Sequence, residues 1–375
     1  MTAEPVTGPS IGQIAVAEDA TTKQLTRIWQ DLLGIDSIGP DQNYFDLGGD
    51  SSLAVHLFVQ IERVFKIKLP LATLFEAPTI AELARILRRE ASQSGWSSLV
   101  PIQTAGLRPP FFCVHGAGGN VLIYRDLAKR LGSDQPFYGL QAPGLDGSCE
   151  PLRRVEDMAA LYAREIRRIQ PRGPYFLGGY CGGGTIAFEV AQQLQAQGER
   201  VALLAMFDTM NWSNIPLPTI WDKGYYSVER FVFHAGNFLR LDPGGRSRFL
   251  KEKTKILRSR IPVWRGMLLA KFDKKRRTDS SKSLVLAKIW QANDQACQSY
   301  VPRPYPGSVA DFRPMKQYRL FNRPDAKWDR LAQGGLEIVV LPLYPAGMLV
   351  EPFVQHLAAA LEKAIDVAVR KSGAI

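Results

Sequence analysis

A glycine-rich stretch between an apolar strand and a helix constrains this chain more than any other feature. It reads Gly178-Gly179-Tyr180-Cys181-Gly182-Gly183-Gly184, after strand-like residues 174–177 and before helical residues 185–194. A nucleophile on a strained strand-to-helix turn leaves no room for side chains beside it, so glycines flank it. The pattern predicts that Cys181 is a nucleophile at a helix N-terminus, where the dipole and backbone N–H groups favour a thiolate and later an oxyanion. A glycine-rich turn with a buried cysteine is the alternative.

Length and composition limit the class of protein. The 375 residues are 46% hydrophobic and 22% charged, which suits a folded protein with room for two or more domains. The first twenty residues lack a basic segment followed by an apolar core, and no apolar run approaches the ~20 residues of a membrane span, so we expect no signal peptide and no membrane partner. The four cysteines are widely spaced, without a Cys-x-x-Cys pair. This spacing predicts a cytoplasmic protein with free thiols and no metal site.

The net charge of +11 is unevenly distributed along the chain. Residues 17–87 carry ten acidic and six basic side chains, whereas residues 241–277 carry thirteen basic and three acidic ones. The basic stretch lacks interleaved aromatic residues and any nucleic-acid reading motif, so we expect no nucleic-acid partner. A solvated helical face and a docking surface for an acidic protein both remain open as explanations of this stretch.

Helical spacing of apolar residues indicates a small domain near the N-terminus. We expect a flexible tail over residues 1–16 and helices over 19–33, from about 51 to 65, over 71–75 and over 79–87. The second helix begins within the run Asn43-Tyr44-Phe45-Asp46-Leu47-Gly48-Gly49-Asp50-Ser51-Ser52-Leu53-Ala54. This run closely resembles the signature of carrier domains in nonribosomal peptide synthetases.

The resemblance implies a four-helix peptidyl or acyl carrier domain over residues 17–90. In that family the serine after Gly-Gly-Asp is esterified by 4′-phosphopantetheine, which here would be Ser51, next to Asp50. A helix N-terminus suits a phosphodiester because it supplies backbone donors and a favourable dipole. A plain helix cap at these two residues is the alternative. The resemblance also implies a phosphopantetheinyl transferase as a partner.

Strands and helices alternate after a linker at residues 91–99. We expect strands at 111–114, 137–140, 174–177, 201–207, 312–315 and 336–342, and helices at 121–131, 155–169, 185–194 and 352–369. The alternation predicts an α/β domain over residues 100–375 with a doubly wound, mostly parallel sheet. Long amphipathic, basic segments interrupt it at about residues 213–300, and we expect these to form a helical lid.

Three motifs stand out in this second part of the chain. They are Cys113-Val114-His115-Gly116-Ala117-Gly118-Gly119, the run from Gly178 to Gly184, and Phe207-Asp208-Thr209. Together they resemble the type I thioesterases that end nonribosomal peptide and polyketide synthetases, an α/β-hydrolase family. The resemblance implies Cys181 as nucleophile, Asp208 as the acid, and the N–H groups of Ala117 and Gly182 as the oxyanion hole. It assigns His115 to the scaffold of the first motif.

The catalytic histidine of that family has no counterpart here. When Met348-Leu349 and Glu351-Pro352 are aligned with the matching residues of the family, Pro345 falls at the position of the catalytic histidine. The four histidines, at 56, 115, 234 and 356, lie elsewhere in the sequence. His234, in the expected lid, is the one candidate base. A cysteine is intrinsically more nucleophilic than a serine, so it can accept an acyl group without a base. Attack of water on the acyl-enzyme ordinarily needs a base, worth about 10²–10⁴ in rate.

These features predict a freestanding carrier–thioesterase pair in the biosynthesis of a secondary metabolite. Ser51 would carry an aminoacyl or acyl group that a separate adenylating enzyme activates, and Cys181 would accept it as an acyl-enzyme. Transfer to a thiol or an amine, on another carrier or synthetase protein, is favoured over hydrolysis. The alternative keeps the carrier and makes the second domain a catalytically degenerate docking scaffold.

Overall fold

The computed structural model of the protein describes residues 11–65, 67, 69–89, 97–212, 220–247, 249–250, 280–319 and 328–373. These residues form two compact units, one up to residue 89 and one from residue 97 onward, and each is described by itself. Residues 1–10 of the predicted tail, 91–96 of the predicted linker, and the lid segments 213–219 and 251–279 lie outside the described residues. The basic stretch is therefore described only as far as residue 250.

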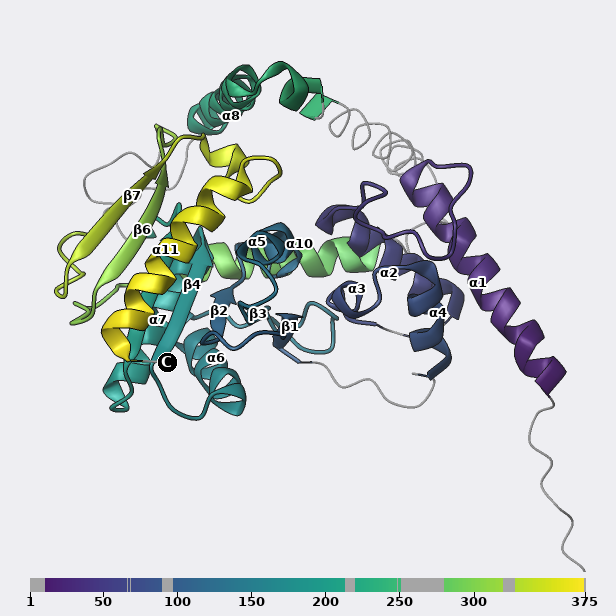
Figure 1. The fold of residues 1–375 in the computed structure, drawn as a ribbon, viewed down its shortest axis with the longest axis horizontal. Helices are drawn as coiled ribbons and strands as arrows, with labels where there is room; N and C mark the ends of the chain where they lie inside the picture. The colour runs from purple at the N-terminus through teal and green to yellow at the C-terminus, as the bar shows by residue number, and fades with distance from the viewer. Residues whose placement is uncertain are drawn as a thin grey trace, which may run out of the picture. The chain divides into compact units, whose positions relative to one another are not determined.

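The first unit consists of helices around a small apolar core. They are α1 (Ile11–Leu33), α2 (Ser51–Phe65), α3 (Thr73–Glu76) and α4 (Ile80–Arg89) (Figure 1). Trp29, Tyr44 and Leu57 are fully buried between α1, α2 and the intervening loop. Helix α1 begins earlier than predicted, so residues 11–16 of the expected tail are helical, and no proline interrupts the helix there. Thr79 and Glu82 cap α4 reciprocally, at 3.2 Å for each backbone bond.

The second unit is built on one seven-stranded sheet. Its strands are β1 (Leu99–Gln103), β2 (Phe111–Val114), β3 (Phe137–Leu140), β4 (Tyr175–Tyr180), β5 (Val201–Phe207), β6 (Val309–Pro314) and β7 (Leu336–Leu341). They lie in the order β1-β3-β2-β4-β5-β6-β7, with β1 antiparallel to β3 and all the other pairs parallel. The sequence analysis missed β1, which contains Pro101 and lies at an edge of the sheet, where a proline is tolerated.

Helices cover both faces of this sheet, as a doubly wound fold requires. The helical segments are η1 (Leu122–Tyr124), α5 (Arg125–Leu131), α6 (Val155–Ile169), α7 (Gly182–Ala196), α8 (Ile220–Arg240), α10 (Ser280–Ser299), η5 (Pro345–Gly347) and α11 (Val354–Ser372). Helix α11 packs with α5, and Figure 1 shows it crossing in front of the strands, whereas α6, α7 and α10 pack together. The main core contains Tyr162 of α6, Leu177 of β4 and Phe188 of α7. Parallel strands bring the loops after β2, β4 and β5 to one edge.

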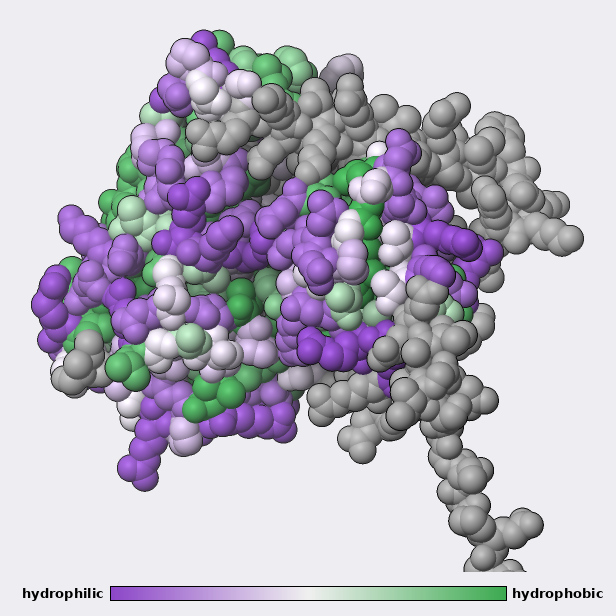
Figure 2. Space-filling view, turned by 45° about the vertical axis from the view of Figure 1, so that its right-hand side comes forward, coloured by the Kyte–Doolittle hydropathy of each residue, from purple (hydrophilic) through white to green (hydrophobic). Residues whose placement is uncertain are grey.

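The described part of the predicted lid includes α8 and α10. Helix α8 exposes a row of large apolar side chains, and Figure 2 shows hydrophobic surface at the end of the molecule where α8 lies. Trp221 is 87% exposed and Phe231 74%. None of the described helices is long and apolar enough to cross a membrane.

Candidate functional site

Cys181 stands on a strained turn between β4 and α7. Its φ of 54° and ψ of −122° are rare for a residue with a side chain, and its N–H donates to Phe207 O at 2.9 Å. A Cβ at Gly179 would lie 2.3 Å from the Gly183 carbonyl carbon, and a Cβ at Gly183 would lie 2.3 Å from His115 O. The two glycines are therefore sterically required, for the reason inferred from the sequence.

His115 holds the loop after β2 and takes no part as a base. The ring is fully buried, with Nδ1 2.7 Å from Gly116 O and Nε2 2.7 Å from the Tyr162 hydroxyl. Burial lowers the pKa of His115 to about 4, so the ring is neutral. A carbonyl only accepts, so Nδ1 carries the proton and the Tyr162 hydroxyl donates to Nε2. In a trans peptide the Ala117 N–H points opposite to Gly116 O, and hence away from the buried imidazole.

A cavity of about 320 Å³ lies beside Cys181. Its wall combines the predicted oxyanion donors, the elbow and the lid helices. The loop after β2 contributes Ala117, the elbow contributes Cys181 and Gly182, α8 contributes Asp222 and Tyr226, and α10 contributes Asn293, Asp294 and Cys297. The cavity therefore has the arrangement needed to hold an acyl group against a nucleophile and two backbone donors.

The thiol of Cys181 is held in its protonated form. Burial raises its pKa to about 12, the carboxylate of Asp208 adds to the rise, and a hydrogen bond from the Gly182 backbone opposes it. Desolvation and the nearby carboxylate both disfavour the thiolate, and so they oppose the effect expected of the helix N-terminus. Cys181 therefore needs a proton acceptor before it can attack.

Asp208 is close enough to Cys181 for its charge to raise the pKa of the thiol, more than Asp294 does. It follows β5 with a φ of 45°, and its N–H donates to Phe312 O at 2.9 Å. Its Oδ1 is buried and has no hydrogen-bond partner among the described residues. Burial and then the charge of Asp311 raise the pKa of Asp208 to about 7, and a hydrogen bond from Gln317 opposes the rise. A carboxyl with this pKa can both take up and release a proton at neutral pH.

Pro345 does not line the cavity, and a series of aromatic ring contacts runs from its neighbour Tyr344 to the cavity wall. It begins η5, directly after Tyr344, and is not among the residues that line the cavity. Ring centroids lie 4.8 Å apart for Tyr344 and Phe233, 5.2 Å for Phe233 and Tyr318, and 4.6 Å for Tyr318 and Tyr226. Tyr226 forms part of the cavity wall. We call these four residues the aromatic row.

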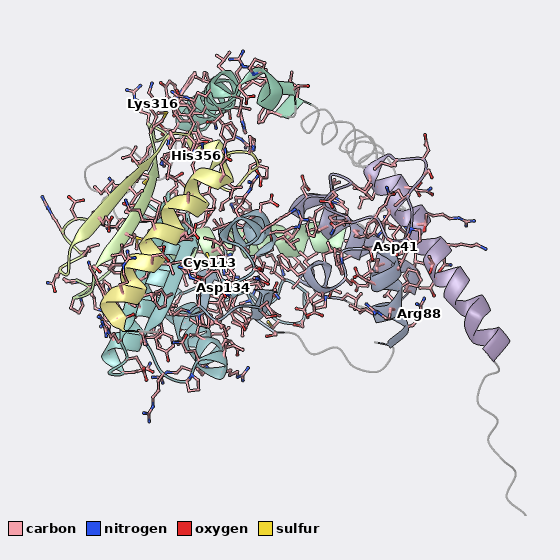
Figure 3. The ribbon with its side chains drawn as sticks, in the orientation of Figure 1. Asp41, Arg88, Cys113, Asp134, Lys316 and His356 are labelled. Carbon is pink, nitrogen blue, oxygen red and sulfur yellow. The ribbon has the colours of Figure 1, made fainter. Side chains whose placement is uncertain are left out.

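Neither His234 nor His356, the other two histidines of the second unit, lines the cavity. His234 is on α8, eight residues beyond Tyr226, which is about 12 Å along a helix, and it does not line the cavity. His56 is in the first unit, and His356 is on α11 (Figure 3). The structure thus brings together Cys181, Ala117 and Gly182, with Asp208 alongside, and leaves out the one candidate base. No group of three or more potential metal ligands occurs among the described residues.

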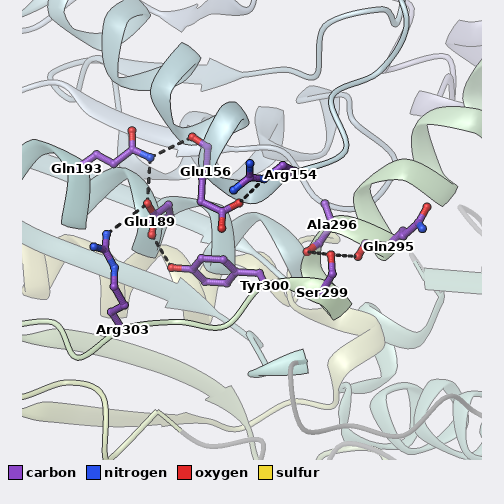
Figure 4. A network of polar contacts seen from close by, with 9 residues as sticks. All are labelled: Arg154, Glu156, Glu189, Gln193, Gln295, Ala296, Ser299, Tyr300 and Arg303. Atoms are coloured by element: carbon purple, nitrogen blue, oxygen red, sulfur yellow. Dashed lines mark hydrogen bonds and ion pairs between the residues drawn. The ribbon is translucent and has the colours of Figure 1, made fainter.

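Helix α10 contributes two contacts to the candidate site that sequence reasoning missed. Asn293 Nδ2 donates to Ala117 O at 2.9 Å, and Cys297 Sγ lies 3.7 Å from Gly182 O. The helix is fixed to α7 by Glu189, which accepts from the Tyr300 hydroxyl at 2.6 Å and lies 3.9 Å from Arg303 (Figure 4). The sequence offered only the amphipathic character of this segment, because contacts made across the fold leave no local motif.

The predicted attachment site lies at the start of α2. Ser51 is the first residue of this helix, and Oδ1 of Asp50 accepts from Leu53 N at 2.8 Å. Asp50 therefore acts as the N-cap, and position 51 is not needed for capping. A Cβ at Gly49 would lie 2.3 Å from the Tyr44 ring, so the Gly-Asp-Ser run fits tightly against the core. The position of Ser51 suits a phosphodiester on the helix N-terminus.

Comparison with family models finds both domains. Residues 23–87 match the phosphopantetheine attachment site family, and residues 109–214 match the thioesterase domain family. The order of the two matches confirms the expected organisation, a carrier followed by a thioesterase-type α/β domain. The first match indicates that phosphopantetheine is the cofactor of the N-terminal domain.

Similar proteins are nonribosomal peptide synthetases. The chain is 45% identical over 184 residues to the dimodular nonribosomal peptide synthase of Bacillus subtilis (strain 168), and 40% identical over 178 residues to the indigoidine synthase of Dickeya dadantii (strain 3937). These matches cover 49% and 48% of this chain but 8% and 12% of the two synthetases. Among solved structures, a holo four-domain nonribosomal peptide synthetase bound to AMP and glycine is similar, with a TM-score of 0.56 and 25% identity. That match covers 96% of this chain and 27% of that one.

Proposed function

We propose that this chain, a phosphopantetheine carrier domain followed by a thioesterase-family domain of the nonribosomal peptide synthetase type, transfers acyl groups through Cys181 to a thiol or an amine. The carrier occupies residues 17–90 and the thioesterase-like domain residues 100–375. One observation supports the proposal above the others. Cys181 lines one cavity together with Ala117 and Gly182, the residues of the two backbone donors. The carboxyl of Asp208 has a buried oxygen without a hydrogen-bond partner among the described residues.

The carrier domain presents the acyl group. When attached to Ser51, the phosphopantetheine arm supplies a terminal thiol that carries an aminoacyl or acyl group as a thioester. Asp50 caps the helix that begins at Ser51 and keeps its N-terminus formed. The proposal requires a phosphopantetheinyl transferase, an adenylating enzyme acting in trans, and further carrier or synthetase proteins as partners. A reducing compartment such as the cytoplasm would keep Cys181 free.

The first half-reaction places the acyl group on Cys181. No hydrogen bond joins Asp208 to Cys181 among the described residues, so in this proposal the proton of the Cys181 thiol passes to the Asp208 carboxylate through one water molecule while Sγ attacks the carbonyl carbon of the incoming thioester. The N–H groups of Ala117 and Gly182 stabilise the oxyanion. As the C–S bond of the incoming thioester breaks, the departing thiolate recovers the proton from Asp208. One thioester replaces another, so the acyl group remains activated.

The second half-reaction favours an acceptor that needs little help to lose its proton. A thiol or an amine is a better nucleophile than water, and an amine brings its own basicity. Water ordinarily depends on a general base worth about 10²–10⁴ in rate. Both ring nitrogens of His115 are already hydrogen-bonded, so the cavity offers no histidine for this task. Transfer should therefore be faster than hydrolysis.

A catalytically degenerate docking scaffold is the second candidate function. The observation that favours it is the thiol of Cys181, whose pKa of about 12 leaves very little thiolate at neutral pH. In that case the carrier would still be loaded at Ser51, and the second domain would bind partner proteins without forming an acyl-enzyme.

Mass spectrometry of the loaded protein distinguishes the two. A promiscuous phosphopantetheinyl transferase and an acyl-coenzyme A load Ser51, and peptide mapping then follows the acyl group. We expect acyl on Cys181 in the wild type and none in Cys181→Ala or Ser51→Ala. Adding a small thiol such as N-acetylcysteamine should discharge the enzyme faster than buffer alone. Full loading of Ser51 with no acyl on Cys181 would favour the scaffold.

A further inference from the structure

The oxyanion loop is held from the lid side by one buried amide. Asn293 of α10 is 3% exposed, and its Nδ2 donates to the carbonyl of Ala117 at 2.9 Å. We propose that Asn293 is a positioning residue that keeps the Ala117 N–H directed at the reacting carbonyl. This inference rests on the proposed acyl transfer at Cys181.

Two consecutive carbonyls of this loop are fixed by different elements. His115 Nδ1 donates to Gly116 O at 2.7 Å, which orients the peptide plane that contains the Ala117 N–H. Asn293 holds the next plane, through Ala117 O. With both neighbouring planes held, the backbone dihedrals of Ala117 are determined. Without Asn293, the peptide plane after Ala117 loses this side-chain hydrogen bond, and the Ala117 N–H is then oriented by the His115 contact alone.

Helix α10 connects the two predicted oxyanion donors. Near its end, Tyr300 donates to Glu189 of α7 at 2.6 Å, and Arg303 lies 3.9 Å from the same carboxylate (Figure 4). Helix α7 begins at Gly182, which provides the second donor. Asn293 therefore ties the loop of the first donor to a helix that is itself anchored to the helix of the second. A shift of α10 would change the spacing between the two donors.

The test compares two reactions of the same thiol. Acylation by the acetyl thioester of N-acetylcysteamine passes through an oxyanion, whereas alkylation by iodoacetamide does not. Asn293→Leu keeps the size of the side chain but replaces the amide, and with it the donor, by an apolar group. Gln291→Ala, an exposed amide on the same helix, is the matched control. All variants carry Cys149→Ser, because Cys149 is exposed and would react. Peptide mapping then reports modification of Cys181 alone.

We expect Asn293→Leu to slow acylation of Cys181 by about 10-fold or more, approaching the roughly 10²-fold typical of a lost oxyanion donor. Alkylation should stay within about two-fold of the wild type. Asn293→Ala, which removes the donor without adding a charge, should show the same split, and it serves if the leucine variant is poorly folded by thermal melting. Gln291→Ala should leave both rates unchanged.

Each contrary result has a distinct meaning. Equal acylation rates in the wild type and both Asn293 variants would overturn the positioning role alone. An equal fall in acylation and alkylation would also overturn it, because it would show a general disturbance of the elbow. A wild-type protein that is alkylated but never acylated would instead remove the proposed function.

Discussion

Asp208→Asn separates the electrostatic effect of this carboxylate from its proposed role in proton transfer. With a pKa of about 12, Cys181 has a thiolate fraction of about 10⁻⁴ at pH 8, since each unit is ten-fold. Burial, the larger cause, remains in the variant. A single nearby like charge shifts a pKa by about one unit or more. Removing it should therefore raise the thiolate fraction about ten-fold at pH values where Asp208 is ionised.

The pH dependence gives this prediction its sign. The pKa of Asp208 is about 7, so below about pH 6 the wild-type carboxyl is neutral and resembles an asparagine. The ratio of alkylation rate constants, Asp208→Asn over wild type, should be about one there. It should rise as the pH passes 7, because the wild type then acquires the charge that opposes the thiolate. Above about pH 8 the ratio should approach ten.

The assay measures iodoacetamide alkylation of Cys181 by peptide mapping, in a Cys149→Ser background, from about pH 5.5 to 9. Acyl transfer from the N-acetylcysteamine thioester is measured in parallel and should fall in the variant, because the proton acceptor is lost. Opposite changes in the two reactions are what the proposed role requires. A ratio that stays at one across the whole range would refute the electrostatic reasoning. An unchanged rate of acyl transfer would refute the role of Asp208 in moving the proton.

Three further substitutions test other parts of the site. Gly183→Ala should lower the melting temperature and abolish acylation of Cys181. The new Cβ would lie 2.3 Å from His115 O, and overpacking of this kind costs about 1–3 kcal/mol. Normal melting together with normal acylation would contradict the elbow geometry. Cys181→Ser should lose at least about 10²-fold in acylation, because a hydroxyl needs a stronger base than a thiol; acyl-serine formed at the wild-type rate in peptide maps would show that a base has been overlooked. Pro345→His alone should leave thioester hydrolysis within about three-fold of the wild type, because position 345 does not line the cavity; a large gain in a thiol-release assay would show that the new imidazole reaches the site.

The backbone of the site was predictable from the sequence, whereas its proton chemistry was not. Glycine spacing around Cys181 and Gly-Gly-Asp before Ser51 are local patterns, so they predicted the elbow and the first residue of α2. The strand pattern predicted the parallel sheet but missed β1, which contains a proline. The raised pKa of Cys181 depends on burial and on Asp208, which approaches from another strand. The contact of Asn293 with Ala117 joins positions 176 residues apart, and no local pattern records it.

The aromatic row limits which single substitutions could add a histidine to this site. A substitution that places histidine at position 345 adds an imidazole but not a path to the cavity, because Phe233 and Tyr318 are in ring contact with Tyr344 and Tyr226 and fill the space between them. Shrinking one ring first would open a cavity and cost about 3–5 kcal/mol for a buried phenylalanine, with nothing gained until the histidine follows. Neither single step is favourable by itself. A triad with a histidine at position 345 would therefore require two substitutions at the same time, one at position 345 and one in the aromatic row.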